Sequence, residues 1–179
     1  MGRAARANMT RKVAGRPDIR LVNAAQSRFS EYIIQNARHG FPVVQSGSAA
    51  GQSLVLCGAG PSLADTAGPE GDQVWACNGA LPWMLEHDHR VTHGFTVNTL
   101  DADLWNPAPD VDYLVASATL PAIVDRLPRA TIFHNTCGPT FQDCEAQDRL
   151  YEQHYPPTCG AGSGLNAVTR AIDVAEYMG

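Results

Sequence analysis

The sequence is poor in lysine, and this scarcity excludes one large class of nucleotide-binding enzymes. Lys12 is the only lysine among 13 basic residues. A Walker P-loop ends in Gly-Lys-Ser or Gly-Lys-Thr, and neither tripeptide occurs in the chain. The sequence therefore does not encode a P-loop NTPase.

Long apolar runs are also missing. No stretch approaches the ~20 apolar residues of a bilayer-spanning helix, and the N-terminus lacks the apolar stretch of a signal peptide. With 179 residues, 44% of them hydrophobic and 17% charged, the chain is long enough to bury a core of its own. These features predict a globular cytoplasmic protein without a membrane partner.

Cysteine pairs at metal-binding or disulfide spacing are absent as well. The five cysteines include no Cys-x-x-Cys pair, which favours reduced thiols over a zinc ribbon or a disulfide framework. His134 and His154 lie near three of the cysteines in sequence, but their irregular gaps favour ordinary loop residues over a zinc cluster. The cysteines are Cys57, Cys77, Cys137, Cys144 and Cys159.

Charge is spread unevenly along the chain. The net charge is 13 − 18 = −5, and five basic residues fall within residues 1–16, so the remainder carries 8 − 18 = −10. An acidic body argues against tight nucleic-acid binding, which needs a clustered basic surface. We expect residues 1–16 to be a disordered, solvated basic head.

The rest of the chain divides into a helical extension and a larger domain. Apolar residues recur at helical spacing from residue 17 to Gly40, and residues 46–51 are typical of a flexible linker. We therefore expect a helical extension and linker over 17–52 and a domain over 53–179.

Within residues 53–179, short apolar runs alternate with helical patterns. This alternation predicts an α/β fold: a Rossmann-like three-layer domain with a mainly parallel sheet. Residues 134–157 show no regular pattern and are expected to be irregular. The expected strands are 53–57, 74–77, 94–97, 113–116 and 131–133, and the expected helices are 79–86, 121–127 and 165–178.

The strongest local motif is Gly58-Ala59-Gly60-Pro61-Ser62-Leu63, which follows the first expected strand. Glycines permit backbone torsions closed to other residues and close approach of a ligand, while Ser62 offers a hydroxyl and a helix cap. The position matches an anion-binding loop at the carboxyl end of a strand. Leu63 stands where a dinucleotide fingerprint needs its third glycine, which argues against a nicotinamide dehydrogenase. A tight structural turn is the alternative.

Two further segments repeat this logic. Gly160-Ala161-Gly162-Ser163-Gly164 precedes the last expected helix, where Ser163 would cap the helix or bind a ligand. Asn78-Gly79 ends the second expected strand, and the Asn78 amide can both donate to and accept from a base or ribose. The alternatives are a flexible connector for the first segment and a plain turn for the second.

Carboxylates that could hold a metal follow the third expected strand. Asp101 and Asp103 are placed by sequence to hold a divalent cation over a phosphate, with solvated loop acids as the alternative.

The motifs together carry a family resemblance. Residues 54–63 (LVLCGAGPSL), 74–80 (VWACNGA) and 162–164 (GSG), followed by the closing Tyr177-Met178-Gly179, resemble the MptE-like 6-hydroxymethylpterin diphosphokinase family. The first loop and the strand-end asparagine are also similar to the nucleotide-sugar loop of a bacterial sialyltransferase family. The resemblance covers residues 53–179.

This resemblance implies a Rossmann-like transferase that moves a diphosphoryl group from ATP to a small-molecule acceptor with the help of magnesium. By position, the residues facing the nucleotide would be Gly58, Gly60, Ser62, Asn78 and Ser163. Family members commonly carry Asp where this chain reads Asn98, which leaves Asp101 as the substitute catalytic residue and metal ligand. Members also continue past the last helix into a strand, so we expect truncation after Gly179 or a strand from a partner, with a minimal domain as the alternative.

Three functions follow from these observations. The leading hypothesis is a nucleotide-dependent transferase of the MptE-like kind, with ATP and magnesium as cofactors. A non-catalytic nucleotide-binding or scaffold module is the second, favoured by the lost Asp and the missing strand. The third, a sialyltransferase-like glycosyltransferase, needs a general base, for which His134 and His154 are the candidates. Catalytic activity and homo-oligomer formation are left open by the sequence.

Overall fold

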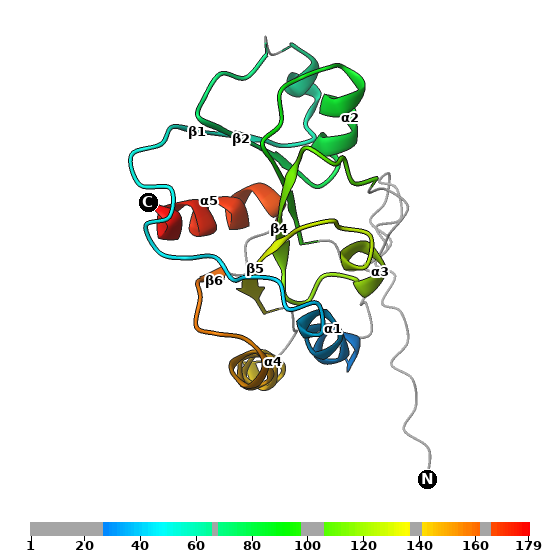
Figure 1. Cartoon of the computed structure of the whole chain (residues 1–179), viewed down its shortest axis with the longest axis vertical. Helices are drawn as coiled ribbons and strands as arrows, with labels where there is room; N and C mark the ends of the chain where they lie inside the picture. The colour runs from blue at the N-terminus through cyan, green and yellow to red at the C-terminus, as the bar shows by residue number, and fades with distance from the viewer. Residues whose placement is uncertain (1–26, 66–67, 98–105, 137–140, 162–165) are drawn as a thin grey trace, which may run out of the picture.

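The protein is built around a six-stranded parallel sheet (Figure 1). The computed structural model describes residues 27–65, 68–97, 106–136, 141–161 and 166–179. Neighbouring strands follow one another in chain order across the sheet. They are β1 (Leu54–Cys57), β2 (Gln73–Cys77), β3 (His93–Thr96), β4 (Asp112–Ala116), β5 (Thr131–Asn135) and β6 (Gly160–Ala161).

Helices cover both faces of the sheet, which makes the fold a three-layer α/β domain of the Rossmann-like kind that the sequence predicts. Helices α1 to α4 pack with one face, whereas α5 lies alone against the other (Figure 1). They are α1 (Ser27–Ala37), α2 (Ala80–Glu86), α3 (Pro121–Val124), α4 (Phe141–His154) and α5 (Ala167–Met178), with a 3₁₀ helix η1 (Pro61–Asp65).

The strand sequences explain the two layers. Strands buried on both faces read as continuous apolar runs rather than as an alternation of apolar and polar residues. In β2, Val74 and Ala76 pack into the core under α1 to α4, while Trp75 and Cys77 pack into the core under α5. All four side chains are at most 2% exposed.

Strand order determines where each helix lies. Because consecutive strands are neighbours, the connections between them fall on the same face, and the last helix is left to cover the other. Helix α5 contacts β1, β2 and β3 as well as β6, so the sheet curls around it. All strands are parallel, so their carboxyl ends share one edge, where open α/β sheets place ligands.

The prediction that residues 134–157 are irregular is wrong, because most of this stretch forms α4. The inward face of this helix includes Gln147, a polar residue that is only 1% exposed, next to Tyr151 and Tyr155. A buried polar residue interrupts the apolar stripe by which a sequence signals a helix. The short strand β6 was also not expected from the sequence.

The helical extension shares the core of the domain that follows it. Ile33 of α1 is fully buried, and the buried Asn36 amide donates hydrogen bonds to the carbonyls of Ser117 and Thr119, at 3.0 and 2.7 Å. Val43 forms a parallel bridge with Ile132 of β5. The first ten residues of the expected helix, 17–26, lie outside the described part of the chain.

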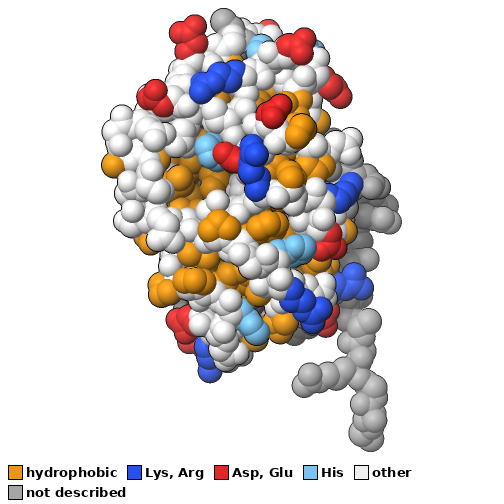
Figure 2. Space-filling model, in the orientation of Figure 1, with side chains coloured by type: hydrophobic (Ala, Val, Ile, Leu, Met, Phe, Trp, Pro, Cys, Tyr) orange, Lys and Arg blue, Asp and Glu red, His pale blue; other side chains and the backbone are white. Residues whose placement is uncertain are grey.

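The helices and the surface charges bear on membranes and nucleic acids. Among the described residues, no helix is both long and apolar enough to cross a membrane. On the face shown in Figure 2, the basic side chains are scattered between apolar and acidic ones.

Candidate functional site

The predicted anion-binding loop lies at the carboxyl end of β1. Residues 59–62 are exposed, and η1 begins within the loop at Pro61. The Leu63 amide donates a hydrogen bond of 3.0 Å to the Gly60 carbonyl. The element that follows the loop is thus a five-residue 3₁₀ helix rather than the α-helix that Ser62 was expected to cap.

The two glycines of the loop differ in the space around them. A Cβ atom on Gly58 would lie 2.9 Å from Cγ2 of Val168 in the first turn of α5, closer than real Cβ atoms approach. A Cβ atom on Gly60 would meet nothing nearer than Ser62 Oγ, at 3.8 Å. Neither glycine has a positive φ, so the expectation of torsions closed to other residues is wrong for both. Gly58 is required by close packing, and Gly60 leaves open space.

Asn78 and Gly79 follow β2, and Gly79 lies beside this loop. Asn78 has a φ of +46°, in the left-handed region that asparagine tolerates better than most residues. Its backbone N–H donates to the Phe95 carbonyl at 2.8 Å, and its Oδ1 accepts from the Val97 N–H at 3.4 Å. These two hydrogen bonds of Asn78 link the end of β2 to the end of β3.

The two loops meet around one cavity of about 390 Å³. Residues of both loops line it, and the loops lie close together, since a Cβ atom added to Gly79 would come within 3.5 Å of the Ala59 Cβ. Trp83 of α2, which was not among the predicted site residues, forms one wall of the cavity, and its ring stacks on His87 with centroids 4.1 Å apart. The lining residues are Ala59, Gly60, Pro61, Leu63, Ala64, Gly79 and Trp83.

The other predicted site residues fall outside the described part of the chain. These are Gly162, Ser163 and Gly164 of the second glycine loop, together with Asp101 and Asp103. Asn166 caps α5, since its side chain accepts from the Thr169 N–H at 3.0 Å, so the capping role expected of Ser163 is wrong. Among the described residues, no three His, Cys, Asp or Glu side chains are grouped to hold a metal ion.

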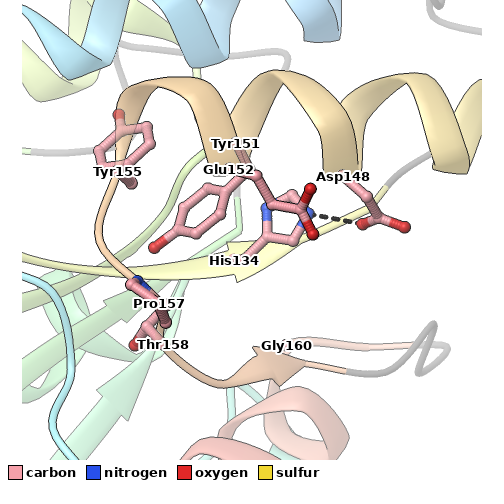
Figure 3. A pocket seen from close by; sticks show the side chains of 8 residues that line it. All are labelled: His134, Asp148, Tyr151, Glu152, Tyr155, Pro157, Thr158 and Gly160. Atoms are coloured by element: carbon pink, nitrogen blue, oxygen red, sulfur yellow. Dashed lines mark hydrogen bonds and ion pairs between the residues drawn. The ribbon is translucent and has the colours of Figure 1, made fainter.

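A second cavity, of about 340 Å³, lies between α4 and the segment that leads into β6 (Figure 3). His134 projects from β5 toward α4, and its Nε2 lies 2.8 Å from Oδ1 of Asp148. Its Nδ1 lies 2.9 Å from Oγ of Ser117. The cavity is lined by His134, Asp148, Tyr151, Glu152, Tyr155, Pro157, Thr158 and Gly160.

The partners of His134 define its hydrogen-bonding state. An ionised carboxylate only accepts, so Nε2 carries the hydrogen and donates it to Asp148, and Nδ1 of the neutral ring accepts from the Ser117 hydroxyl. Burial lowers the pKa of His134 below its ordinary value of 6.5, although Asp148 and Glu152 act in the opposite direction. The neutral ring is therefore the favoured form near neutral pH.

Serine, histidine and aspartate here do not form a hydrolase triad. Ser117 is fully buried, whereas the Asp148 side chain is 51% exposed. A nucleophilic triad places its serine toward the substrate and its aspartate behind the histidine. The order is reversed in this protein, so the group that reaches the cavity is the carboxylate.

Aromatic rings back the second cavity. Tyr151 stacks between His134 and Tyr155, with ring centroids 4.2 and 4.7 Å apart. Burial raises the pKa of both tyrosines, which keeps their hydroxyl groups protonated. His134 is a candidate that the sequence predicts, whereas its neighbours from α4 are not. The spacing of Tyr151 and Tyr155, one helical turn apart, is the signal that would have placed them on one face.

Comparisons of the chain with protein-family models, with curated proteins and with solved structures find no match.

Proposed function

We propose that this protein is a nucleotide-dependent transferase of the MptE-like kind, which binds its nucleotide between the loops that follow β1 and β2. The observation that supports this proposal is the meeting of the two predicted loops around one cavity at the carboxyl edge of the sheet. In parallel α/β folds, the loops at the carboxyl ends of the strands are the usual place for a ligand.

The composition of this cavity suits a phosphate-bearing ligand. None of the seven described residues that line it is charged, so no lining carboxylate repels the phosphates. The exposed backbone around Gly60 allows close approach, because no side chain fills the space above it. Trp83 supplies an aromatic wall of the kind against which a nucleobase packs.

The transfer chemistry in this proposal comes from the sequence resemblance. Moving a diphosphoryl group from ATP breaks the bond between the β-phosphorus and the oxygen that bridges it to the α-phosphorus, and AMP leaves with that oxygen and the electron pair. An acceptor hydroxyl forms the new bond to the β-phosphorus and loses its proton. Asp101, with Asp103 behind it, remains the residue predicted to hold magnesium, which neutralises phosphate charge when bound.

Tryptophan fluorescence offers a direct test of nucleotide binding. Titration with ATP, GTP and CTP, each with and without magnesium, should change the emission of Trp83, because the ligand enters the cavity that this ring lines. A Trp83→Phe variant should lose most of this signal. Unchanged emission of the wild-type protein, together with no heat of binding in calorimetry, would contradict the proposal.

Gly60→Val is the variant that blocks the cavity. There is room for a side chain at Gly60, so the fold should persist, while the added methyl groups should weaken nucleotide binding by at least about tenfold. Gly68→Ala is a matched control at an exposed glycine outside the cavity lining, and it should bind as the wild type does. Equal affinity of the Gly60→Val variant would show that the nucleotide binds elsewhere.

Turnover separates the transferase from its alternatives. Release of AMP from ATP in the presence of an acceptor would support diphosphoryl transfer, whereas binding without turnover would favour a nucleotide-binding module. Glycosyl transfer would instead require a general base, and of the two candidates His134 has both ring nitrogens engaged, by Ser117 and by Asp148, which leaves His154 at the end of α4 as the candidate base for that alternative.

A further inference from the structure

The cavity under α4 has the dimensions of a small-molecule site but no role in the proposed nucleotide site. Its volume of about 340 Å³ falls within the range of about 300–1,000 Å³ that small ligands occupy. It shares none of its lining residues with the cavity of the glycine loop. It is also bounded by different elements, α4 and the segment 157–160 (Figure 3).

The side chains around this cavity already donate their hydrogens to protein acceptors. The Tyr151 hydroxyl donates to the Pro156 carbonyl at 3.3 Å, and the Tyr155 hydroxyl to the Ile33 carbonyl at 3.4 Å. The Thr158 hydroxyl donates to the Val44 carbonyl at 2.6 Å. Each hydroxyl has one hydrogen, so what these side chains can still offer a ligand is lone pairs.

The charged side chains that line the cavity are both acidic. Asp148 and Glu152 lie one turn apart on α4, and Figure 3 shows both carboxyl groups beside the His134 ring. His134 donates its Nε2 hydrogen to Asp148 and is neutral in this arrangement. None of the eight described lining residues is lysine or arginine. The lining therefore consists of two negative charges, hydroxyl lone pairs and aromatic carbon.

We propose that this cavity binds a small organic cation that carries N–H donors, a primary ammonium or guanidinium group on an apolar or aromatic body. The N–H groups would bond to the carboxylates of Asp148 and Glu152, and the body would pack beside the Tyr151 and Tyr155 rings. An anion would meet like charges and no side-chain donor. This inference does not depend on the proposed nucleotide site.

Four probes of similar shape separate charge from donor capacity. Benzylamine is a cation with three N–H donors, benzyltrimethylammonium is a cation without donors, benzyl alcohol is neutral with one donor, and benzoate is an anion. Benzylamine at about ten times its dissociation constant should raise Tm by roughly 3–6 °C. Benzyltrimethylammonium should raise Tm less, benzyl alcohol less again, and benzoate not at all.

Substitutions on α4 test whether benzylamine binds in this cavity. Calorimetry of benzylamine should show about tenfold weaker binding or more for Asp148→Asn, and again for Glu152→Gln, because each removes a charged acceptor. Glu145→Gln is the matched control, since Glu145 lies on the same helix outside the cavity and pairs with Arg149 at 3.5 Å. It should bind benzylamine as the wild type does.

Several results would overturn the inference. They are benzoate binding as tightly as benzylamine, benzylamine affinity unchanged in both Asp148→Asn and Glu152→Gln, and absence of benzylamine binding to a folded wild-type protein. Binding of Ca²⁺ or Zn²⁺ that requires Asp148 and Glu152, without any amine binding, would show that the cavity binds a metal ion instead of an organic cation. Circular dichroism of each variant shows whether weak binding comes from loss of the fold.

Discussion

Gly58 shows how one residue links the proposed nucleotide loop to the far side of the sheet. It follows β1, and the space that its side chain would occupy is taken by Val168, in the first turn of α5. The requirement for glycine is therefore one of packing, because its φ is not positive. The loop conformation and the position of α5 are coupled through this contact.

Gly58→Ala should lower the free energy of unfolding by about 1–3 kcal/mol, as overpacking does in cores. The added methyl group would press on Val168 Cγ2, which lies 2.9 Å from the Cβ position. In a Val168→Ala background the same change should cost at least about 0.5 kcal/mol less, because the obstructing methyl is gone. Urea unfolding of the four proteins of this cycle gives the coupling. Equal costs in both backgrounds would refute the packing explanation.

At the scale of elements, the strands were the most predictable part of the fold. Five apolar runs coincide with β1 to β5 to within two residues, because strands covered on both faces are continuously apolar. Helix α4 and strand β6 were not predictable in the same way. The buried Gln147 breaks the helical stripe, and β6 consists of the two small residues Gly160 and Ala161.

Helix α5 is the only helix on its face of the sheet among the described residues, and a side chain caps its first turn. Asn166 accepts a hydrogen bond from the Thr169 N–H at 3.0 Å, and Ala171 and Val174 of the helix are fully buried. Loss of an N-cap typically lowers stability by about 1 kcal/mol.

Asn166→Ala should therefore lower the free energy of unfolding by about 1 kcal/mol, whereas Asn166→Asp should retain most of the stability that the cap contributes. Aspartate keeps the acceptor oxygen, and its negative charge is favourable at the helix N-terminus. Chemical denaturation measures both changes. If Ala and Asp prove equally destabilising, the cap does not stabilise the helix.

At the scale of the whole molecule, the buried His134 and the half-buried His93 make stability depend on pH. Burial lowers the pKa of His93 and of His134 below the ordinary 6.5, while Asp112 opposes this shift at His93 and Asp148 and Glu152 oppose it at His134. Below pH 6.5 the unfolded chain consequently binds more protons than the folded protein. Folding stability is fully present above that pH and decreases as the pH falls through the window down to the lower folded-state values.

We expect the free energy of unfolding to fall below pH 6.5 with a slope of at most about 1.4 kcal/mol per pH unit for each histidine. His134→Gln and His93→Gln should each reduce this slope, and the double variant should reduce it most. Urea unfolding between pH 5 and pH 7.5 measures the slopes. A double variant with the wild-type slope would assign the pH dependence to other groups. Asp72, whose pKa is lowered by hydrogen bonds from Ser53, acts only near and below its ordinary value of 3.8.

The location of the candidate site could be predicted from the sequence better than the residues that line it. Parallel strands place their carboxyl ends at one edge, so the loop of Gly58 and Gly60 and the pair Asn78-Gly79 could be expected side by side. Trp83 and Asp148 were not predictable, because their positions depend on how α2 and α4 pack on the sheet. That packing depends on contacts between residues far apart in the chain.

The central claim is that a nucleotide binds between the loops of β1 and β2, and amide NMR spectra of the ¹⁵N-labelled protein titrated with ATP test it most directly. We predict that the largest shift changes fall on the amides of Ala59, Gly60, Ser62 and Gly79, together with the Trp83 indole N–H. Shift changes confined to α4 and residues 157–160, or none at saturating ATP, would contradict the claim.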